Sequence, residues 1–321
     1  MSPLPGWAWS PGARTSTLLN LWPEQLRGLR AWRCCLAIAS LCWALSCGSA
    51  AAAPPPALVT ILDGQAELLI GARSVVAAEG LRLGEGTLVD TSPRTTLMRL
   101  EWPDGSVLDL GPDTRVMLKP GALGRKVEGA PAFYLLQGWA KFRSAPAQGH
   151  PGFATQRLDV LPAKGSVVAF VEPARTWLFV ESGDVRVAER DGKGRHNLAG
   201  GGSYLRAGQG TPELAPRPQP ELLKLVPRGF RDTIAPRADR FKGQPEPSAV
   251  ALQAPVYAAI QAWLQAEPAV RRDFPKRLAV LAREPSFRAA VDAHMRSHPE
   301  WEPVLHPPLP KTVVTPYGER R

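Results

Sequence analysis

The sequence predicts a mainly β fold, a twisted β-sandwich or β-solenoid domain followed by a small α-helical C-terminal unit. Between residues 57 and 210, short segments alternate apolar and polar side chains, as in Val185-Arg186-Val187, and turn signals recur about every 8–12 residues. Helical spacing of apolar residues begins after residue 248. A proline-rich stretch over residues 211–247 separates the two regions.

Residues 1–52 have the order of a secretory signal peptide with a long N-terminal extension. Three arginines between residues 27 and 33 precede the apolar run "CCLAIASLCWALSC", and the small-residue stretch "GSAAAAPPP" follows it. We expect cleavage between Ala52 and Ala53. The apolar run is shorter than the roughly 20 residues that a membrane-spanning helix needs, so no transmembrane span is predicted after processing.

The cysteines indicate the compartment. All four lie between Cys34 and Cys47, so the processed chain would hold none and could use neither thiol catalysis nor cysteine metal ligands. An exported protein without disulfides fits the bacterial periplasm. Two alternatives stay open: a lipid anchor on Cys47, and an uncleaved signal anchor. Residues 1–25 are also consistent with an over-extended start.

The net charge of +10 is spread along the chain. It divides into +3 for residues 1–52, +2 for residues 53–212 and +5 for residues 213–321. The dense Lys/Arg runs with interleaved aromatic residues that nucleic-acid-binding proteins show are missing, so no nucleic-acid partner is predicted.

The β region is expected to begin with a hairpin. "ALVTIL" and "QAELLI" flank Asp63-Gly64, and an Asp-Gly pair between apolar runs is a strong short-range hairpin signal. Further strands are predicted along "LRLGEGTLVDT", "TTLMRLEW", "SVLDL", "RVMLK", "FYLLQGWAKF", "RLDVL", "SVVAFVE", "RTWLFVE", "DVRVAE" and "SYLRAG". Their alternation predicts one buried face and one solvated face.

The C-terminal part divides into three. Residues 211–247 predict a basic linker with extended, polyproline-like backbone rather than a core, in which "ELLKLV" could form a short docking element. Residues 248–303 predict a helical mini-bundle that opens with a helix along "VALQAPVYAAIQAWLQA" and packs on the β domain or on a partner. Residues 304–321 form a proline-rich, basic tail.

A short internal repeat supports the mini-bundle. "LQAEPAVRRDF" is followed 17 residues later by "LAREPSFRAAV", and "MRSHPEW" is a partial third copy. In each copy a proline opens a new helical segment, where its missing N–H is no loss. Two residues later Val270, Phe287 and Trp301 are expected to point inward.

The stretch "EWPDGSVLDLGPDT" carries three aspartates, Asp104, Asp109 and Asp113. A calcium loop would need oxygen ligands at alternating positions of an irregular chain, whereas the residues between these aspartates are apolar and strand-like. Pro-Asp-Gly and Gly-Pro-Asp are turn sequences with a known mechanism. We therefore predict two turns between strands rather than a metal site.

The region over residues 58–210 resembles the FecR domain of bacterial envelope proteins. The resemblance is carried by turn and strand residues of "LRLGEGTLVDT", "LEWPDGSVLDLGPDTRVML", "LLQGWAKF" and "FVESGDVRVAE". These residues are Gly84, Asp104, Gly105, Ser106, Gly111, Pro112, Gly138 and Gly183. The sequence departs from the family pattern near "AKGSVVAFVE", where Gly165 is followed by Ser166.

The resemblance implies a FecR-like, non-enzymatic β module in the periplasm. Some members of the family are anti-sigma regulators with a cytoplasmic helical domain. About 30 residues precede the signal segment here, too few for such a domain, so the stand-alone exported kind is expected. We predict a protein-binding or scaffolding role with envelope protein partners, and a glycan or peptidoglycan contact stays open. The alternative is a signal-transduction regulator.

Catalytic and metal-ligating motifs give weaker signals. No catalytic, cofactor-binding or metal-binding residue is predicted. His294 and His298 stand at helical spacing, but Pro299 disfavours helix at His298, which favours a solvated helix end. Carboxylates for glycoside cleavage cannot be paired from sequence. The candidate acids are Glu101, Asp104, Asp109, Glu172, Glu181 and Asp184, and the tryptophans Trp102, Trp139 and Trp177 are expected to be core rather than a glycan platform.

Overall fold

The computed structural model describes residues 56–120, 123, 130–145, 152–192 and 194–307. The predicted signal peptide, its cleavage site at Ala52 and Ala53, and most of the predicted tail lie outside these residues. The described residues all belong to one compact unit. None of their helices is long and apolar enough to cross a membrane.

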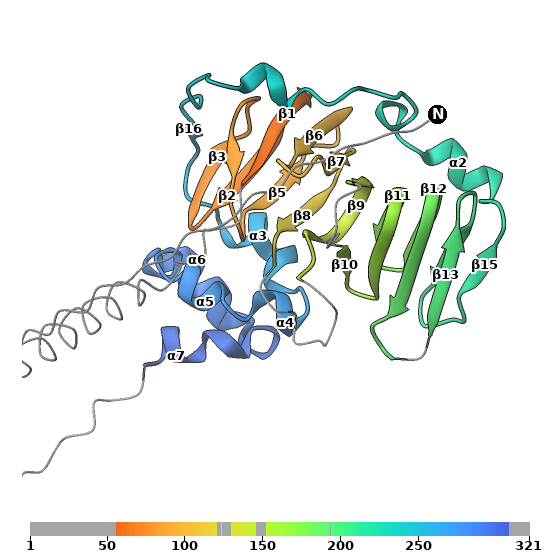
Figure 1. The fold of residues 1–321 in the computed structure, drawn as a ribbon. Coiled ribbons are helices and arrows are strands. Elements are labelled where there is room, and N and C mark those ends of the chain that lie inside the picture. Colours follow the sequence, from red (N-terminus) through yellow and green to blue (C-terminus); the bar gives the residue numbers. More distant parts are fainter. Residues whose placement is uncertain (1–55, 121–122, 124–129, 146–151, 193, 308–321) are drawn as a thin grey trace, which may run out of the picture. The chain divides into compact units, whose positions relative to one another are not determined.

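Sixteen described strands form one hydrogen-bonded sheet, which confirms the mainly β fold (Figure 1). The strands are β1 (Ala57–Asp63), β2 (Ala66–Ile70), β3 (Arg73–Val76), β4 (Arg82–Leu83), β5 (Leu88–Thr91), β6 (Leu97–Glu101), β7 (Val107–Leu110), β8 (Arg115–Leu118), β9 (Phe133–Ser144), β10 (Phe153–Thr155), β11 (Leu158–Glu172), β12 (Arg175–Glu189), β13 (Arg195–Ala199), β14 (Ser203–Ala207), β15 (Glu213–Ala215) and β16 (Val250–Ala251).

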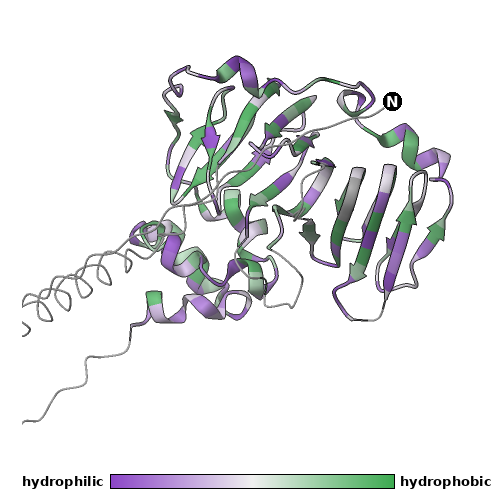
Figure 2. Ribbon diagram, viewed as in Figure 1, coloured by the Kyte–Doolittle hydropathy of each residue, from purple (hydrophilic) through white to green (hydrophobic). Residues whose placement is uncertain are grey.

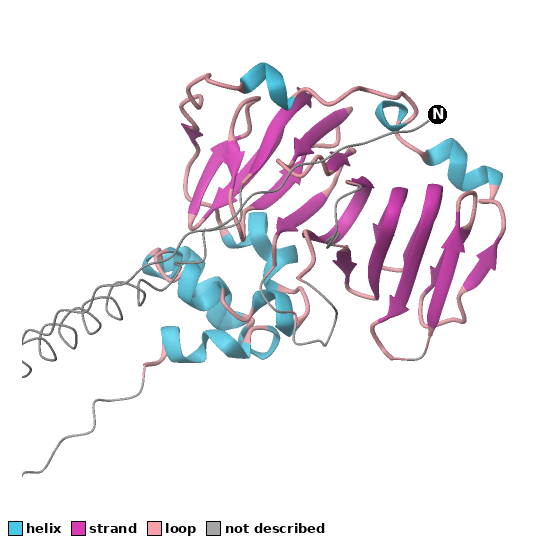
Figure 3. Ribbon diagram, in the orientation of Figure 1, coloured by secondary structure: helices cyan, strands magenta, loops and turns pink. Residues whose placement is uncertain are grey.

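Helical segments follow the strands, as predicted, and most of them lie together (Figure 3). The α-helices are α2 (Pro220–Leu225), α3 (Tyr257–Leu264), α4 (Pro268–Arg271), α5 (Phe274–Arg277), α6 (Pro285–Ala293) and α7 (Glu302–Leu305). The 3-10 helices are η2 (Arg228–Phe230), η3 (Ala238–Phe241), η4 (Leu281–Arg283), η5 (Met295–Ser297) and η6 (Pro299–Trp301).

The hairpin predicted at Asp63-Gly64 is wrong. β1 pairs with β4 and β6, and β2 pairs with β3 and β5, so the chain changes ladders at this point instead of turning back on itself. Thr95 holds the corner, because its Oγ1 accepts from Gln65 N at 3.2 Å and donates to Gln65 O at 2.5 Å. Thr96 N donates to Asp63 O at 2.8 Å. These long-range bonds override the local turn preference.

In two places, two strands that were predicted separately form one continuous strand. "RLDVL" and "SVVAFVE" form the 15-residue β11, and "RTWLFVE" and "DVRVAE" form the 15-residue β12. An extended strand of that length would span roughly 50 Å. The hairpin instead curls back, since Arg157 beside its start donates to Pro173 O beside its tip. Register shifts near Ser166 supply the bend.

Strands β6, β7 and β8 differ from the predicted pattern of one buried and one solvated face. Their residues are buried almost without exception. Met98 and Leu100 face the main apolar core, whereas Arg99 and Glu101, which alternate with them, are buried under the chain that follows α2. Figure 2 shows mostly hydrophobic residues in this part of the sheet and hydrophilic ones interspersed along β12 and β13.

We call residues 227–238 the strap: this part of the predicted linker follows α2 and runs along the sheet (Figure 1), and its backbone contacts buried charged side chains of the strands. Arg99 Nη1 donates to Ile234 O at 2.9 Å, and Lys141 Nζ donates to Phe230 O at 2.7 Å. The Glu101 carboxylate accepts from the N–H groups of residues 237 and 238. The strap therefore adds Phe230 to a core cluster, which corrects the prediction of a linker without a core.

The helical segments pack on the sheet. Leu88, Met117 and Tyr134 of the strands share one apolar cluster with the helices. Prolines stand in the first turns of α4, α6 and η6, and the predicted inward residues are buried: Val270, Phe287 and Trp301. The first predicted helix, however, begins at Tyr257, because Val250 and Ala251 instead pair with β3.

Candidate functional site

A polar cavity of about 450 Å³ opens where the curled β11–β12 hairpin, β14 and the start of α4 meet. We call it the arginine cavity. Its lining residues are Gln156, Arg157, Pro173, Arg190, Asp191, Arg206, Gln209 and Glu267. They come from five connections and one strand, and the curl of the hairpin brings most of them together. The volume is in the range of small-molecule sites.

Arg157 is fixed by its local chain. Thr155 Oγ1 accepts from Arg157 N at 3.2 Å and from Leu158 N at 3.0 Å, which makes a tight turn between β10 and β11. The Arg157 guanidinium donates to Gly208 O at 2.6 Å and to Pro173 O at 3.0 Å. Both partners are neutral carbonyl oxygens, and the side chain is half-buried.

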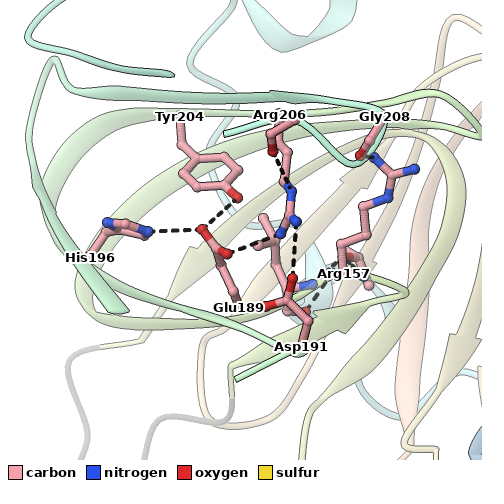
Figure 4. A network of polar contacts seen from close by, with 10 residues as sticks. Arg157, Glu189, Asp191, His196, Tyr204, Arg206 and Gly208 are labelled. Carbon is pink, nitrogen blue, oxygen red and sulfur yellow. Dashed lines mark hydrogen bonds and ion pairs between the residues drawn. The ribbon is translucent and has the colours of Figure 1, made fainter. Parts of the chain in front are cut away.

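Arg206 belongs to a largely buried network of polar side chains at the wall of the cavity (Figure 4). Glu189 Oε2 lies 3.0 Å from Arg206 Nη1, and Glu189 Oε1 lies 3.0 Å from His196 Nε2 and 3.3 Å from the Tyr204 hydroxyl. Asp191 Oδ2 lies 3.0 Å from Arg206 Nη2. Two carboxylates on one guanidinium hold it in a single geometry at the cavity wall.

The charges of this network follow from burial and pairing. Burial, together with the neighbouring Glu189 carboxylate, raises the pKa of Tyr204 to about 12, so its hydroxyl stays protonated and donates to Glu189. The Asp191 hydrogen bond raises the pKa of Arg206. Arg206 is therefore cationic at any physiological pH.

Arg190 connects the cavity to the helical segments. Its Nη1 lies 2.7 Å from Glu267 Oε1, at the start of α4, and donates to Thr155 O at 2.9 Å. Burial raises the pKa of the neighbouring Tyr134 hydroxyl, and the Glu267 charge adds to the shift. This ion pair joins the β sheet and the helices on one side of the cavity.

The residues of the FecR resemblance lie elsewhere and are not brought together into one site. Asp104, Gly105 and Ser106 form the turn between β6 and β7, where Asp104 Oδ1 accepts from Ser106 N at 2.8 Å. Gly84 follows β4, and Gly183 lies opposite Gly165 in the bend of the long hairpin. None of them lines the arginine cavity.

Gly111, Pro112 and Gly138 do lie close to one another, around the turn that joins β7 to β8. A Cβ on Gly138 would lie 2.5 Å from Asp113 O, and the residue has a φ of +90°. A Cβ on Gly111 would lie 2.9 Å from Pro227 of the strap. These glycines therefore allow close packing of the backbone.

The three aspartates of "EWPDGSVLDLGPDT" have separate positions. Asp104 stabilises its own turn, Asp109 is a buried partner of Arg99, and Asp113 adopts a φ of +48° between β7 and β8. The predicted turns are confirmed at both places. Within the described ranges no group of three or more His, Cys, Asp or Glu side chains is placed to hold a metal ion.

The prediction of a solvated helix end is wrong for His298, which is fully buried. Its Nε2 lies 2.8 Å from the Tyr257 hydroxyl and its Nδ1 lies 3.0 Å from Leu264 O. A neutral imidazole with its proton on Nδ1 satisfies both contacts, and burial lowers the pKa of His298. His294 is exposed and contacts Ala290 O.

The candidate tryptophans are core, as expected. Trp102, Trp139 and Trp177 are each less than a tenth exposed. Trp139 stacks on Phe170 with ring centroids 4.1 Å apart and meets Trp177 edge-on. They form no exposed platform for a glycan.

Sequence reasoning did not find the arginines of the cavity. Arg157, Arg190 and Arg206 are far apart in the chain, and each follows or lies within a strand with no motif around it. The one local signal was "RDG" at residues 190–192, an aspartate-glycine turn that places two charged side chains at the end of β12. The curl of the hairpin, which collects the three, has no sequence motif.

Comparisons with known proteins give little. No family model and no curated protein matches the chain. Two crystal structures of a "putative anti-sigma factor" from Parabacteroides distasonis, at 2.50 and 1.65 Å resolution, are similar to it at 16% and 15% sequence identity, each with a TM-score of 0.36. The similarity covers 43% of this chain and 63% and 64% of those chains, less than two thirds of their length. A likeness at this TM-score does not establish a shared fold.

Proposed function

We propose that this chain is an exported, non-enzymatic binding or scaffolding module of the bacterial cell envelope, of the FecR-domain kind. The signal-peptide pattern, the confinement of all cysteines to residues 34–47 and the FecR-like turn residues support this reading. The arginine cavity is then the place where the module receives its ligand.

One observation supports the non-enzymatic part: four of the six candidate acids have structural partners. Asp109 pairs with Arg99, and Glu101 accepts backbone N–H groups of the strap. Glu172 pairs with Arg175, and Glu181 with Lys141. A carboxylate engaged in such contacts would have to leave its partner before it could protonate a glycosidic oxygen or attack a sugar.

Fractionation of cells expressing the full chain tests the location. We expect the protein in the periplasmic fraction with Ala53 as its first residue, and the Cys47→Ser variant with the same distribution. A lipid anchor would instead make that variant leave the membrane fraction. Recovery of the whole chain from the cytoplasm would refute the proposal.

Incubation of the recovered protein with purified peptidoglycan tests the non-enzymatic role. We expect no release of soluble fragments, with or without retention on the polymer. Release of fragments, abolished by the Glu181→Gln or Asp184→Asn variant, would favour the polysaccharide-acting alternative. Cross-linking in intact cells then separates a scaffold, which gives a constant protein partner, from a glycan-binding module.

The regulator drawn from the FecR resemblance is the second candidate. A gene for a sigma factor beside this gene, and a change in that sigma factor's output when this gene is deleted, would select it. An unchanged output would leave the scaffold reading.

A further inference from the structure

We infer that the arginine cavity binds the oxyanion group, carboxylate or phosphate, of a small polar ligand. The inference rests on the proposed function of a binding module and names the chemical class of its ligand. Three features of the described residues carry it: the charge of the lining, the way each guanidinium is held, and the polar groups at the rim.

The three arginines of the lining differ in their partners. Arg206 lies beside two carboxylates, Glu189 and Asp191, and Arg190 lies between Glu267 and Asp159. The Arg157 guanidinium instead donates to two neutral carbonyl oxygens. The positive charge that an anion in the cavity would meet is therefore that of Arg157.

The guanidinium groups are also held in position before a ligand arrives. The Arg206 guanidinium contacts the carboxylates of Glu189 and Asp191 and donates to the carbonyl of Gly210. Arg157 is held by Gly208 O and Pro173 O, which occupy two of its five N–H donors. Rigid arginines lose little side-chain entropy on binding, and their forked donors match the geometry of carboxylate and phosphate oxygens.

The rim suits a polar ligand rather than an apolar one. Gln156 and Gln209 are exposed beside Arg157 and supply amide donors and acceptors. Pro173 is the one apolar side chain among the eight lining residues. A sugar acid or a phosphate ester, with hydroxyl groups around one anionic group, has the complementary chemistry.

Calorimetric titration of the protein recovered from cells expressing the full chain tests the inference. The probes are D-glucuronate, inorganic phosphate and, as a neutral match, D-glucose, each at low and at raised salt. We expect saturable one-to-one binding of one or both anions, weakened by salt, and none of glucose. Binding of glucuronate alone identifies a carboxylate ligand, and binding of phosphate alone identifies a phosphate ligand. Binding of both shows that the cavity recognises the oxyanion group that they share.

Three variants locate the binding. Arg157→Gln should raise the Kd by about 10- to 100-fold, the effect of losing a charged hydrogen-bond partner. Arg157→Lys keeps the charge but not the fork and should lie between that variant and the wild type. Asp191→Asn removes a negative charge from the lining while its amide oxygen can still accept from Arg206, and it should lower the Kd by about two- to fivefold. The exposed Arg94, outside the lining, supplies the control Arg94→Gln.

The inference is overturned if neither anion binds saturably, or if Arg94→Gln weakens binding as much as Arg157→Gln does. If Arg157→Gln does not fold, as circular dichroism would show, the opposite effect of Asp191→Asn still decides the matter, because unspecific loss of stability cannot tighten binding. A periplasmic protein that binds no anion would leave the proposed function standing. If the protein is cytoplasmic but binds an anion, the proposed function is refuted and the anion site still stands.

Discussion

Replacing Arg99 with methionine should destabilise the fold more than any exposed charge replacement. Arg99 is completely buried, and its Nε and Nη2 meet the Asp109 carboxylate at 2.6 and 2.8 Å. Its third contact is the carbonyl of Ile234 in the strap. Lys141 lies beside Asp109 in register on the next strand, so the pair belongs to a cross-strand row of alternating charge.

The magnitude follows from leaving Asp109 buried without its partner. Removing one member of a buried ion pair costs about 3–5 kcal/mol. Lys141, as the register neighbour, should keep the loss near the lower end. For a domain above 200 residues, each kcal/mol lowers Tm by about 2–4 °C, so a loss of about 3 kcal/mol should lower Tm by roughly 6–12 °C. The double variant Arg99→Met with Asp109→Leu should be more stable than either single variant, because no charge is then left unpaired.

Urea and thermal unfolding of the wild type, the two single variants and the double variant measure these differences. The pair Arg175–Glu172 is the control, since its side chains are 35% and 42% exposed, and Arg175→Met should cost less than about 1 kcal/mol. Limited proteolysis reports the strap separately, and Arg99→Met should make it easier to cleave. The reasoning is refuted if Arg99→Met costs no more than Arg175→Met, or if the double variant loses the sum of the two single losses.

Three further predictions concern pH and the close approach of the backbone. Burial raises the pKa of Asp90 from 3.8 to about 6. Since the folded state then binds the proton more tightly than the unfolded state, the free energy of unfolding should fall as pH rises between these values. Unfolding measurements across pH should show this fall in the wild type and not in Asp90→Asn. Burial lowers the pKa of His298. The free energy of unfolding should therefore fall as the pH decreases below 6.5, the ordinary pKa of histidine, and hydrogen exchange in α3 should become faster. The His298→Gln variant should lose less stability at acidic pH. Gly138→Ala should destabilise by more than about 1 kcal/mol because of its clash and its positive φ, whereas Gly71→Ala, also at positive φ but with open space around it, should cost less in the same assay.

Local patterns predicted the class of fold and several of its details. Alternation and regular turn signals located most strands between residues 57 and 210, and prolines at the start of helical segments located α4, α6 and η6. The two turns of "EWPDGSVLDLGPDT" were also predictable, because Pro, Asp and Gly have backbone preferences that act over three or four residues. These are short-range effects, and the sequence states them directly.

Pairing between distant segments was not predictable in the same way. Asp63-Gly64 has the sequence of a hairpin, yet Thr95 turns it into a corner between two ladders. Val250 has helical spacing with Tyr257, yet it joins β3 as an edge strand. In both cases hydrogen bonds to residues far along the chain outweigh a preference that is worth about 1 kcal/mol.

The sequence by itself determined the mainly β class, the helical C-terminal part and the turns, all of which depend on composition or on neighbouring residues. The export signal stays a prediction from the sequence. Only the tertiary structure decided that the proline-rich stretch is a strap over buried charges, that His298 is core, and that three distant arginines line one cavity. The physical reason is that a charged side chain carries no local sign of its partner. Whether it is solvated, buried in an ion pair or directed into a cavity depends on which strands the curled hairpin brings together.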